Sequence, residues 1–418
     1  MLLPYAATAG LSPAQMLARH RALLADDHAA PAATPFGIGL QVGTRPSGLP
    51  ALLGDPVGDG TAALQFRQRV LPRHATPLGI EVRIGALSEG PESDVELDGS
   101  AVDVGIGPGL AYASVEPRHW GPGWFGSLIL DAAAAPLPAI GWRGGAPADA
   151  DGVQRWSADV FIARLQGHTR PQNPQLVGMR FEWRPDAAWT LGFARTLQWG
   201  GRGRDRSARS LLDALIGRDN VGDAGITSAN EPGNQLAGVD LRHDGRAGAL
   251  SYGLYAQIVG EDEAHLFPSL KMLLAGADVG GAVSGGASWR AMFEWADTTA
   301  GAISSRVAPG AAYRHPLFAQ GYTHRGRMLA HALGGDARLA TFGLIADRGP
   351  AAAIVALHRG RALDASQRFT PGVLLRGVDL AFTVALDRRA QYGLAAQRWR
   401  AGASVEHRGA LWAQYSWP

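Results

Sequence analysis

The residues best suited to chemistry in this sequence gather between Trp199 and Gln235. Gly200, Gly201 and Gly203 follow the tryptophan, and four arginines lie within eight positions of one another: Arg202, Arg204, Arg206 and Arg209. A guanidinium group binds carboxylates and phosphates through two parallel hydrogen bonds, so this stretch predicts a site for an acidic ligand. Further on come more groups that bond sugar hydroxyls, namely Asp213, Arg218, Asn220, Asn230, Glu231 and Asn234. Such groups beside an aromatic ring are typical of carbohydrate sites, where the ring packs on the sugar.

A second group of candidates, Tyr322, His324, Arg325 and Arg327, could form another sugar contact. A solvated hairpin loop explains these residues equally well. The first stretch also has a structural alternative, in which it folds inward and its charges pair with Arg180, Glu182, Arg290 and Glu294. The two roles can coexist, because polar residues in a loop are often structural.

Catalysis is not indicated. The acidic triplet Glu261, Asp262 and Glu263 could supply the carboxylate pair of a hydrolase, but three adjacent acids are typical of a solvated turn, with no apolar pocket to raise a pKa. The twelve histidines show no metal-ligand spacing, and there are no cysteines. We therefore expect no enzyme activity, no metal and no cofactor.

Composition excludes several classes of protein. The 418 residues include 56 glycines and are 46% apolar, with a mean hydropathy of -0.04. A spanning helix needs 18 or more apolar residues, and the longest candidate, Asp131 to Trp142, is broken by Pro136 and Pro138. Any membrane crossing must therefore use strands. Nucleic-acid binding is not expected, because 39 basic residues are balanced by 37 acidic ones.

From Phe36 onward the main signal is alternation with a period of two residues, in segments separated by Gly, Pro, Asp and Arg. In Gln175 to Trp183, the apolar residues fall on one face while Arg180 and Glu182 fall on the other. The alternation recurs in Leu250 to Ile258, Trp289 to Trp295 and Leu411 to Trp417. Several segments begin or end on Trp or Tyr, as residues at a bilayer interface do. We count roughly sixteen to eighteen strands, a number that single-chain membrane barrels use. A soluble β-protein would give a similar pattern.

Two helices interrupt this pattern. Ser12 caps the first, which runs to Asp26 within an N-terminal segment, 1–35, that we expect to be periplasmic. The second is expected over Ala208 to Ile216, before Gly217. The first ten residues lack a basic region and an apolar core, so we expect a processed or truncated start.

Three longer stretches resemble the Wzi capsule assembly family. They are Arg118 to Trp142 (RHWGPGWFGSLILDAAAAPLPAIGW), Arg195 to Gly238, and His315 to Asp336 (HPLFAQGYTHRGRMLAHALGGD). Together they place the chain from about Tyr112 to its end in register with the family. Before about residue 110 the match is poor. Within the first stretch, Trp120 and Trp124 flank Gly-Pro-Gly, which favours a tight turn with aromatics at the bilayer interface.

The resemblance implies an all-β fold: a transmembrane antiparallel barrel of about 18 strands over 36–418, with a short N-terminal helix and loop helices that plug the lumen. An extracellular plug loop is expected around 199–235. The implied function is non-catalytic binding and organisation of capsular or extracellular polysaccharide at the bacterial outer membrane, through Trp199, Arg202, Arg204, Arg206, Asp213, Arg218, Asn220, Asn230, Glu231, Asn234, Tyr322 and Arg325. Expected partners are the polysaccharide and outer-membrane lipid, with the capsule export machinery as a further candidate, and we expect a monomer. A porin for small solutes is the alternative.

Overall fold

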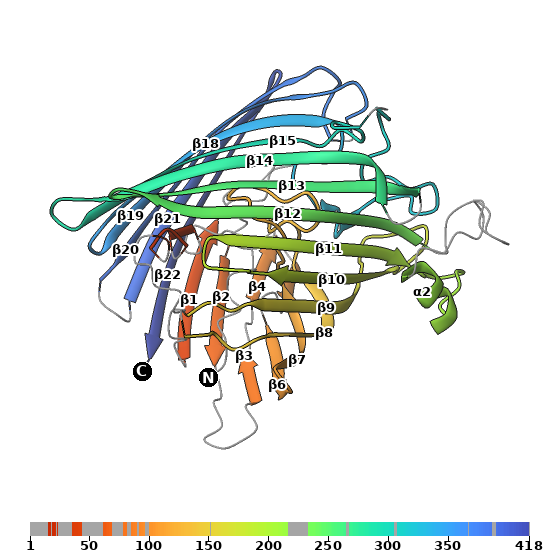
Figure 1. The fold of residues 1–418 in the computed structure, drawn as a ribbon, viewed down its shortest axis with the longest axis horizontal. Coiled ribbons are helices and arrows are strands. Elements are labelled where there is room, and N and C mark those ends of the chain that lie inside the picture. The colour runs from red at the N-terminus through yellow and green to blue at the C-terminus, as the bar shows by residue number, and fades with distance from the viewer. Residues whose placement is uncertain are drawn as a thin grey trace.

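The chain forms one large curved sheet whose first and last strands meet (Figure 1). The computed structural model describes residues 16–17, 19–21, 23, 36–43, 62–68, 78–81, 85–89, 92–96, 100–150, 152–215, 233–264, 267–304, 307–366, 368–386 and 390–417. In this part of the chain, eighteen antiparallel strands join the sheet: β1 (Phe36–Gly43), β2 (Ala62–Gln68), β3 (Leu78–Glu81), β6 (Ala101–Ile106), β7 (Gly109–Glu116), β8 (Leu137–Gly145), β9 (Trp156–Arg164), β10 (Gln175–Trp183), β11 (Trp189–Trp199), β12 (Gly233–Ala247), β13 (Leu250–Ala264), β14 (Phe267–Val283), β15 (Ala287–Asp297), β18 (Ala337–Arg348), β19 (Ala351–Ala362), β20 (Leu374–Ala385), β21 (Ala390–Ala401) and β22 (Ser404–Trp417).

From β3 onward each strand of the sheet pairs with the next, and β22 pairs with β1, which pairs with β2. Two hairpins lie outside the sheet, formed by β4 (Gly85–Glu89) with β5 (Glu92–Glu96) and by β16 (Thr323–His324) with β17 (Arg327–Met328). The predicted all-β barrel of about 18 strands is therefore confirmed. No helix among the described residues is long and apolar enough to cross a membrane.

The two faces of the sheet differ as alternation predicts. On β10, Phe181 and Trp183 point outward and are 42% and 45% exposed, whereas Arg180 points into the lumen and is 3% exposed. Phe193 on β11 and Val239 on β12 continue the outward apolar surface beside Phe181. An apolar exterior around a polar interior is the arrangement of a barrel whose outer wall meets lipid.

The two ends of the barrel also differ. Short turns at 107–108, 248–249 and 349–350 connect strands at one end. Long connections at 117–136, 165–174, 200–232 and 298–336 lie at the other. In outer-membrane barrels the short turns are periplasmic and the long loops extracellular, which orients the molecule.

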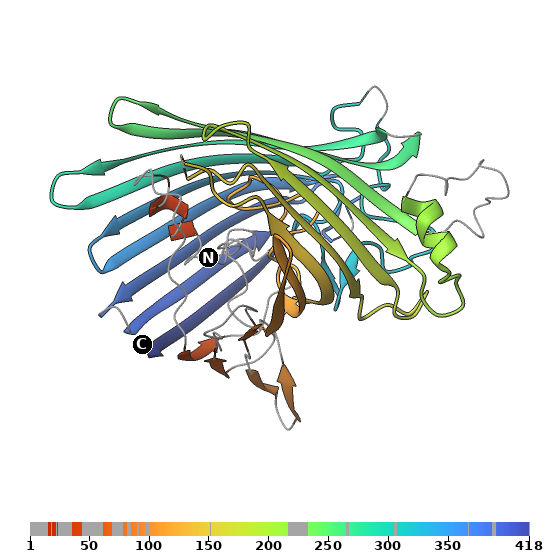
Figure 2. The ribbon, with the colours of Figure 1, turned by 60° about the horizontal axis from the view of Figure 1, so that its bottom comes forward.

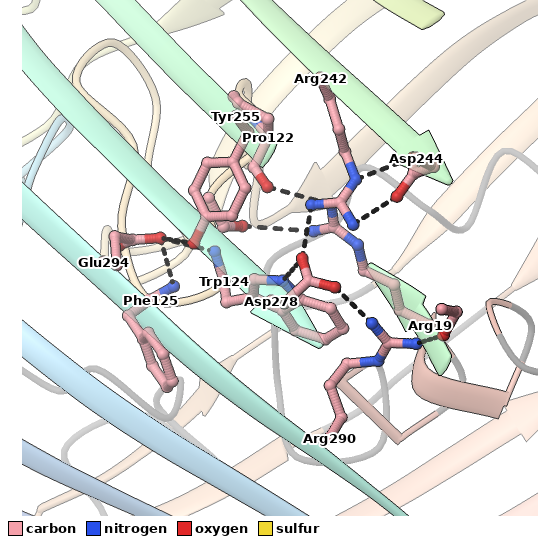
Figure 3. A network of polar contacts seen from close by, with 12 residues as sticks. Arg19, Pro122, Trp124, Phe125, Arg242, Asp244, Tyr255, Asp278, Arg290 and Glu294 are labelled. Atoms are coloured by element: carbon pink, nitrogen blue, oxygen red, sulfur yellow. Dashed lines mark hydrogen bonds and ion pairs between the residues drawn. The ribbon is translucent and has the colours of Figure 1, made fainter. Parts of the chain in front are cut away.

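The lumen is filled by residues 117–136, which we call the lumen plug. Trp120 and Trp124 are 1% and 0% exposed. The interpretation of this pair as interface aromatics in a turn is therefore wrong. Their rings enter the barrel because the wall offers polar partners there: the Trp124 indole Nε1 donates to Asp278 Oδ2 at 2.8 Å (Figure 3). The Gln257 side chain of β13 in turn donates to the Trp120 carbonyl at 2.7 Å.

One wall carboxylate holds the bend of the lumen plug. Glu294 Oε2 on β15 accepts the backbone N–H of Trp124 at 2.8 Å and that of Phe125 at 3.4 Å (Figure 3). It also accepts the hydroxyl of Tyr255 at 3.0 Å. Because all four groups are buried, these hydrogen bonds satisfy donors that water cannot reach.

Toward the short-turn end, the interior holds helical residues 16–17, 19–21 and 23, the described part of the predicted N-terminal helix (Figure 2). Arg19 stacks over the Trp124 ring at 4.4 Å and donates to the Pro122 carbonyl at 3.0 Å. His20 contacts Ser288 Oγ at 2.9 Å, and Arg21 forms a two-pronged ion pair with Asp347 at 2.7 and 2.8 Å. The lumen is thus occupied from both ends.

Replacing Glu294 by Ala should release the lumen plug. The substitution leaves the Trp124 N–H and the Tyr255 hydroxyl buried without their acceptor, at about 1–3 kcal/mol each. Single-channel recording in planar bilayers should then show openings that the parent protein lacks. As a control, Tyr255→Phe removes one of these hydrogen bonds and leaves no unsatisfied donor, so it should stay closed. A Glu294→Ala protein as silent as the parent would show that the plug is held elsewhere.

Candidate functional site

The long-loop end is covered by an extracellular cap, which we define as residues 165–174, 200–215 and 315–326. Backbone hydrogen bonds join its three loops: Arg202 N–H to Gln172 O, Ala319 N–H to Arg170 O and Arg325 N–H to Gln166 O, each 2.9 Å. Side chains reinforce them, since Arg325 Nε donates to Gln166 Oε1 at 2.7 Å. Loops far apart in the sequence thus form one layer.

The cap is strongly basic. Six arginines and two aspartates lie in it, and six minus two gives a net charge of +4. The arginines that are exposed are Arg170, Arg202, Arg206, Arg209 and Arg325. Hydrogen bonds from the backbone and hydroxyl of Ser207 lower the pKa of the exposed Asp205 carboxyl, so that this acid is ionised. The other acid, Asp213, lies 3.8 Å from Arg209.

Among the arginines predicted to bind ligand, the structure separates exposed groups from a structural one. Arg202 is exposed and donates to Gln172 Oε1 at 3.3 Å. Arg206 is exposed and donates from Nε to the Gly201 carbonyl at 3.1 Å. Arg204 is half-buried, with its guanidinium 5.7 Å from the ring centre of Phe318. Arg202 and Arg206 therefore face solvent from the cap, while Arg204 packs within it.

Three other predicted contacts lie inside the protein. Tyr322 is 1% exposed, and its hydroxyl donates to Thr196 Oγ1 at 2.8 Å. Asn234 is 6% exposed, and its amide donates to Gln198 Oε1 at 2.9 Å. Trp199 is 5% exposed. The expectation of direct sugar contact is wrong for these three side chains in this conformation, because packing and neighbouring hydrogen-bond partners already occupy them.

Trp199 instead anchors helix α2 (Ala208–Leu215), which confirms the predicted helix to within one residue. Its Nε1 donates to Ser210 Oγ at 3.1 Å, and Ala214 packs with Trp199, Leu197 and Val177. Val177 shares its face of β10 with the outward-facing Phe181, so α2 covers the outer wall (Figure 1). The described part of the loop predicted to plug the lumen, residues 200–215, therefore lies at the rim and outside it, and the lumen is filled by 117–136 instead.

Four predicted contacts, Arg218, Asn220, Asn230 and Glu231, lie outside the described residues. Glu261, expected in a solvated acidic turn, is 5% exposed in β13 and accepts the backbone N–H of Tyr313. That expectation is wrong for Glu261, because the long loop 298–336 folds over the strand end and excludes water. No cluster of side chains suited to a metal ion occurs in the described part of the chain.

A polar pocket that the sequence analysis missed opens at the same end of the barrel. It has a volume of about 250 Å³ and is lined by Arg368, Phe369, Thr370, Val373, Ala401, Ser404 and Glu406. A guanidinium, a carboxylate, two hydroxyls and an aromatic ring are groups that bind sugars. The sequence alone gave no signal for it, because the lining comes from two segments that only the strand pairing brings together.

Two histidines join the loops of the cap. His168 Nε2 lies 2.8 Å from the Thr323 carbonyl, and His324 Nδ1 accepts the backbone N–H of Gln166 at 3.0 Å. Burial lowers the pKa of His168, and burial, assisted by Arg325, lowers the pKa of His324 to about 4. The folded cap therefore holds His324 in its neutral form, the form whose nitrogen can accept a hydrogen bond.

Acid should loosen the cap. Because the folded-state pKa of His324 lies below the ordinary value of 6.5, its contribution to stability is present above pH 6.5 and is lost as pH falls toward about 4. Opening should rise by at most about tenfold per pH unit for each proton bound. Hydrogen exchange at 165–174, corrected for intrinsic pH dependence, should show this rise. His324→Asn keeps an acceptor without a titrating group, so its exchange should depend less on pH. Equal pH dependence in both proteins would contradict the assignment.

Comparison with known proteins agrees with this geometry. The family model described as capsule assembly protein Wzi matches residues 86–404. A 176-residue segment is 34% identical to an uncharacterized 55.8 kDa protein in the cps region of Klebsiella pneumoniae. That match covers 40% of this chain and 34% of the relative, so the chain spans about a third of the length of the curated relative.

Solved structures share the fold. Wzi of Escherichia coli, described as an outer membrane protein involved in group 1 capsule assembly and a carbohydrate binding β-barrel, aligns with a TM-score of 0.74 at 20% identity. The alignment covers 92% of this chain and 85% of that one. OccK10 of Pseudomonas aeruginosa aligns with a TM-score of 0.50 at 11% identity, covering 92% of this chain and 99% of that one. Since the family model matches most of the sequence and the fold is the same, the chain is an outer-membrane β-barrel that belongs to the Wzi capsule assembly family.

Proposed function

We propose that the extracellular cap binds an acidic capsular polysaccharide and holds it at the cell surface. The observation that carries the proposal is the set of exposed arginines that the cap displays at the long-loop end of a barrel with a filled lumen: Arg170, Arg202, Arg206, Arg209 and Arg325. Guanidinium groups pair with carboxylates in a planar, two-pronged geometry. The relative from Escherichia coli, described as a carbohydrate binding barrel, supports this reading.

The cap supplies amides as well as charge. Gln166, Gln172 and Asn173 are exposed beside the arginines, and each can donate and accept hydrogen bonds with sugar hydroxyls. The aromatic side chains of the cap, in contrast, are buried: Phe318 and Tyr322 are each 1% exposed. Recognition in this layer thus rests on charge and hydrogen bonding, and its strength should depend on salt.

A porin function is supported less well. A diffusion channel needs an open lumen, whereas Trp120, Trp124, Leu128, Ile129 and Leu130 are each at most 1% exposed inside this barrel. Tyr313 of the long loop closes over them and donates its hydroxyl to the Leu128 carbonyl at 3.0 Å. Packed side chains thus fill the described part of the lumen.

Our proposal includes no catalytic step. Thr341, His358 and Asp379 are arranged like a nucleophile relay, with distances of 2.9 and 3.1 Å between successive side chains. Each of the three is at most 4% exposed. Phe125 of the lumen plug meets the His358 ring edge-on at 6.3 Å, and the Trp399 ring stacks on its face at 4.8 Å. Because these three residues are buried, a polymer cannot reach them. Their contacts indicate a structural role, in which His358 packs against Phe125 of the lumen plug.

Replacing Arg202, Arg206 and Arg209 together by Gln should weaken binding of the producing strain's purified polysaccharide about tenfold at low salt, if each exposed ion pair contributes up to about 1 kcal/mol. Surface plasmon resonance with the detergent-solubilised protein measures the change. High salt should reduce binding of the parent protein toward the level of the variant. Carboxyl reduction of the polysaccharide should do the same.

The matched control is Arg184→Gln, Arg246→Gln and Arg348→Gln, which removes the same charge near the short turns at the other end of the barrel. This control should bind like the parent. Unchanged affinity in the cap variant, with the barrel shown intact by its heat-modifiable gel shift, would exclude the cap as the binding surface.

A further inference from the structure

Six arginines occupy the outer wall of β18, β19, β20 and β21, at the ends of these strands nearest the long loops. All six are exposed: Arg338, Arg359, Arg361, Arg376, Arg398 and Arg400. Each alternates with lumen-facing residues and shares its face with outward apolar residues such as Leu357 and Val378, which are 48% and 38% exposed. The guanidinium groups therefore leave the wall on the side that faces the membrane.

The strand register places these cations directly beside one another. Arg359 on β19 pairs with Arg376 on β20, which pairs with Arg400 on β21. Arg338 on β18 pairs with Arg361 on β19. Residues opposite each other on antiparallel strands have Cβ atoms about 4.5–5.5 Å apart, and like charges in such positions destabilise a sheet. An anion placed against such a row would relieve this repulsion.

The described residues supply little negative charge to this row. Arg338 is paired with Asp297, at 2.7 Å. Arg400 donates from Nε to the Gly402 carbonyl at 2.8 Å. For Arg359, Arg361, Arg376 and Arg398, no carboxylate partner occurs among the described residues. Among the described residues, the wall thus presents four guanidinium groups without a carboxylate partner.

Their height on the barrel indicates where that charge comes from. Arg359 lies two residues beyond Leu357 toward the long loops, and Arg376 lies two residues from Val378 in the same direction. They sit at the edge of the apolar belt, on the extracellular side, where the headgroups of the outer leaflet lie. The strands β18 to β21 form one unbroken section of wall there (Figure 1).

We propose that this row of arginines binds the phosphate groups of lipid headgroups in the outer leaflet, so that the barrel holds an anionic lipid against β18–β21. A phosphate monoester carries a charge of about -1.5 to -2 with several acceptor oxygens, and one such group can bridge two neighbouring guanidinium groups. Acyl chains below it would pack on the outward apolar residues of the same strands. The row lies on the wall, away from the cap, so this function is separate from polysaccharide binding.

The test compares the detergent-solubilised parent with Arg359→Gln/Arg376→Gln and with a control, Arg164→Gln/Arg348→Gln. The control also removes two exposed, outward arginines, but these pair across strands with Gln175 and with Ala287 and Ala351 rather than with arginine. Native mass spectrometry measures binding of phosphatidic acid, with phosphatidylcholine as the lipid that lacks a phosphomonoester. Thermal unfolding is followed without lipid, with phosphatidic acid and with inorganic phosphate.

We expect the parent and the control to bind phosphatidic acid over phosphatidylcholine, and the Arg359/Arg376 variant to bind it at least about tenfold more weakly. Without lipid, this variant should unfold at the same temperature as the parent or higher, because two repelling charges are gone. It should still bind polysaccharide like the parent, which separates a failure here from a failure of the cap. Equal phosphatidic acid affinity in all three proteins would overturn the proposal. So would stabilisation by inorganic phosphate equal to that by the lipid, since the row would then serve a free anion.

Discussion

The packing of the barrel interior depends on the contacts made by the carboxylate of Asp278. It is buried on β14, accepts the Trp124 indole N–H at 2.8 Å and forms ion pairs with Arg242, at 2.8 Å, and with Arg290 (Figure 3). A buried charge without partners would be unstable, so this group joins two wall arginines and the lumen plug in one arrangement. Arg19 adds a further contact, because its guanidinium carbon lies over the Trp124 ring, 4.4 Å from the ring centre. The lumen is therefore packed like the core of a soluble domain, but with paired charges in place of much of the apolar contact.

A filled lumen moves function to the outer surfaces. In a porin, the charged side chains of the interior select solutes. In this barrel, the interior Arg180 instead forms ion pairs with Asp240, at 2.8 Å, and with Glu182, at 2.7 Å. Exposed arginines of the described residues lie instead on the cap and on the outer wall. Both surfaces are rich in arginine, whose planar group suits carboxylates and phosphates alike. The same residue type thus faces two different chemical environments, one aqueous and one at the bilayer interface.

The sequence predicts the wall far better than the interior. The period of two placed β10 at Gln175–Trp183 with the observed bounds, and Ser207 marks the start of α2, where its hydroxyl accepts the Ser210 N–H at 3.1 Å. These features depend on neighbours in the chain. The position of Trp124 depends instead on Asp278 and Glu294, over 150 residues away, and Gly-Pro-Gly beside a tryptophan fits a surface turn just as well.

The candidate site shows the same limit. Arginine spacing at 202–209 was sufficient to predict one exposed basic loop of the cap, because exposed charge in a loop needs no tertiary partner. The roles of Trp199 and Tyr322 could not be read in this way, since an aromatic ring serves equally as a sugar platform or as core, and Ser210 and Thr196 decide between them. The sequence did not predict the row of arginines on β18–β21, for another reason. Arg359, Arg376 and Arg400 are far apart in the sequence, and only the strand register shows that they are neighbours.

The position of the N-terminal helical residues has a consequence for how the barrel is assembled. They precede β1, yet His20 and Arg21 contact Ser288 and Asp347, residues 268 and 326 positions later in the chain. Closing loops of this length costs conformational entropy, which the contacts inside the folded lumen must offset. The helical residues ahead of β1 can thus take up their place only after β15 and β18 have brought Ser288 and Asp347 into the wall, so their docking is expected to be a late step of assembly.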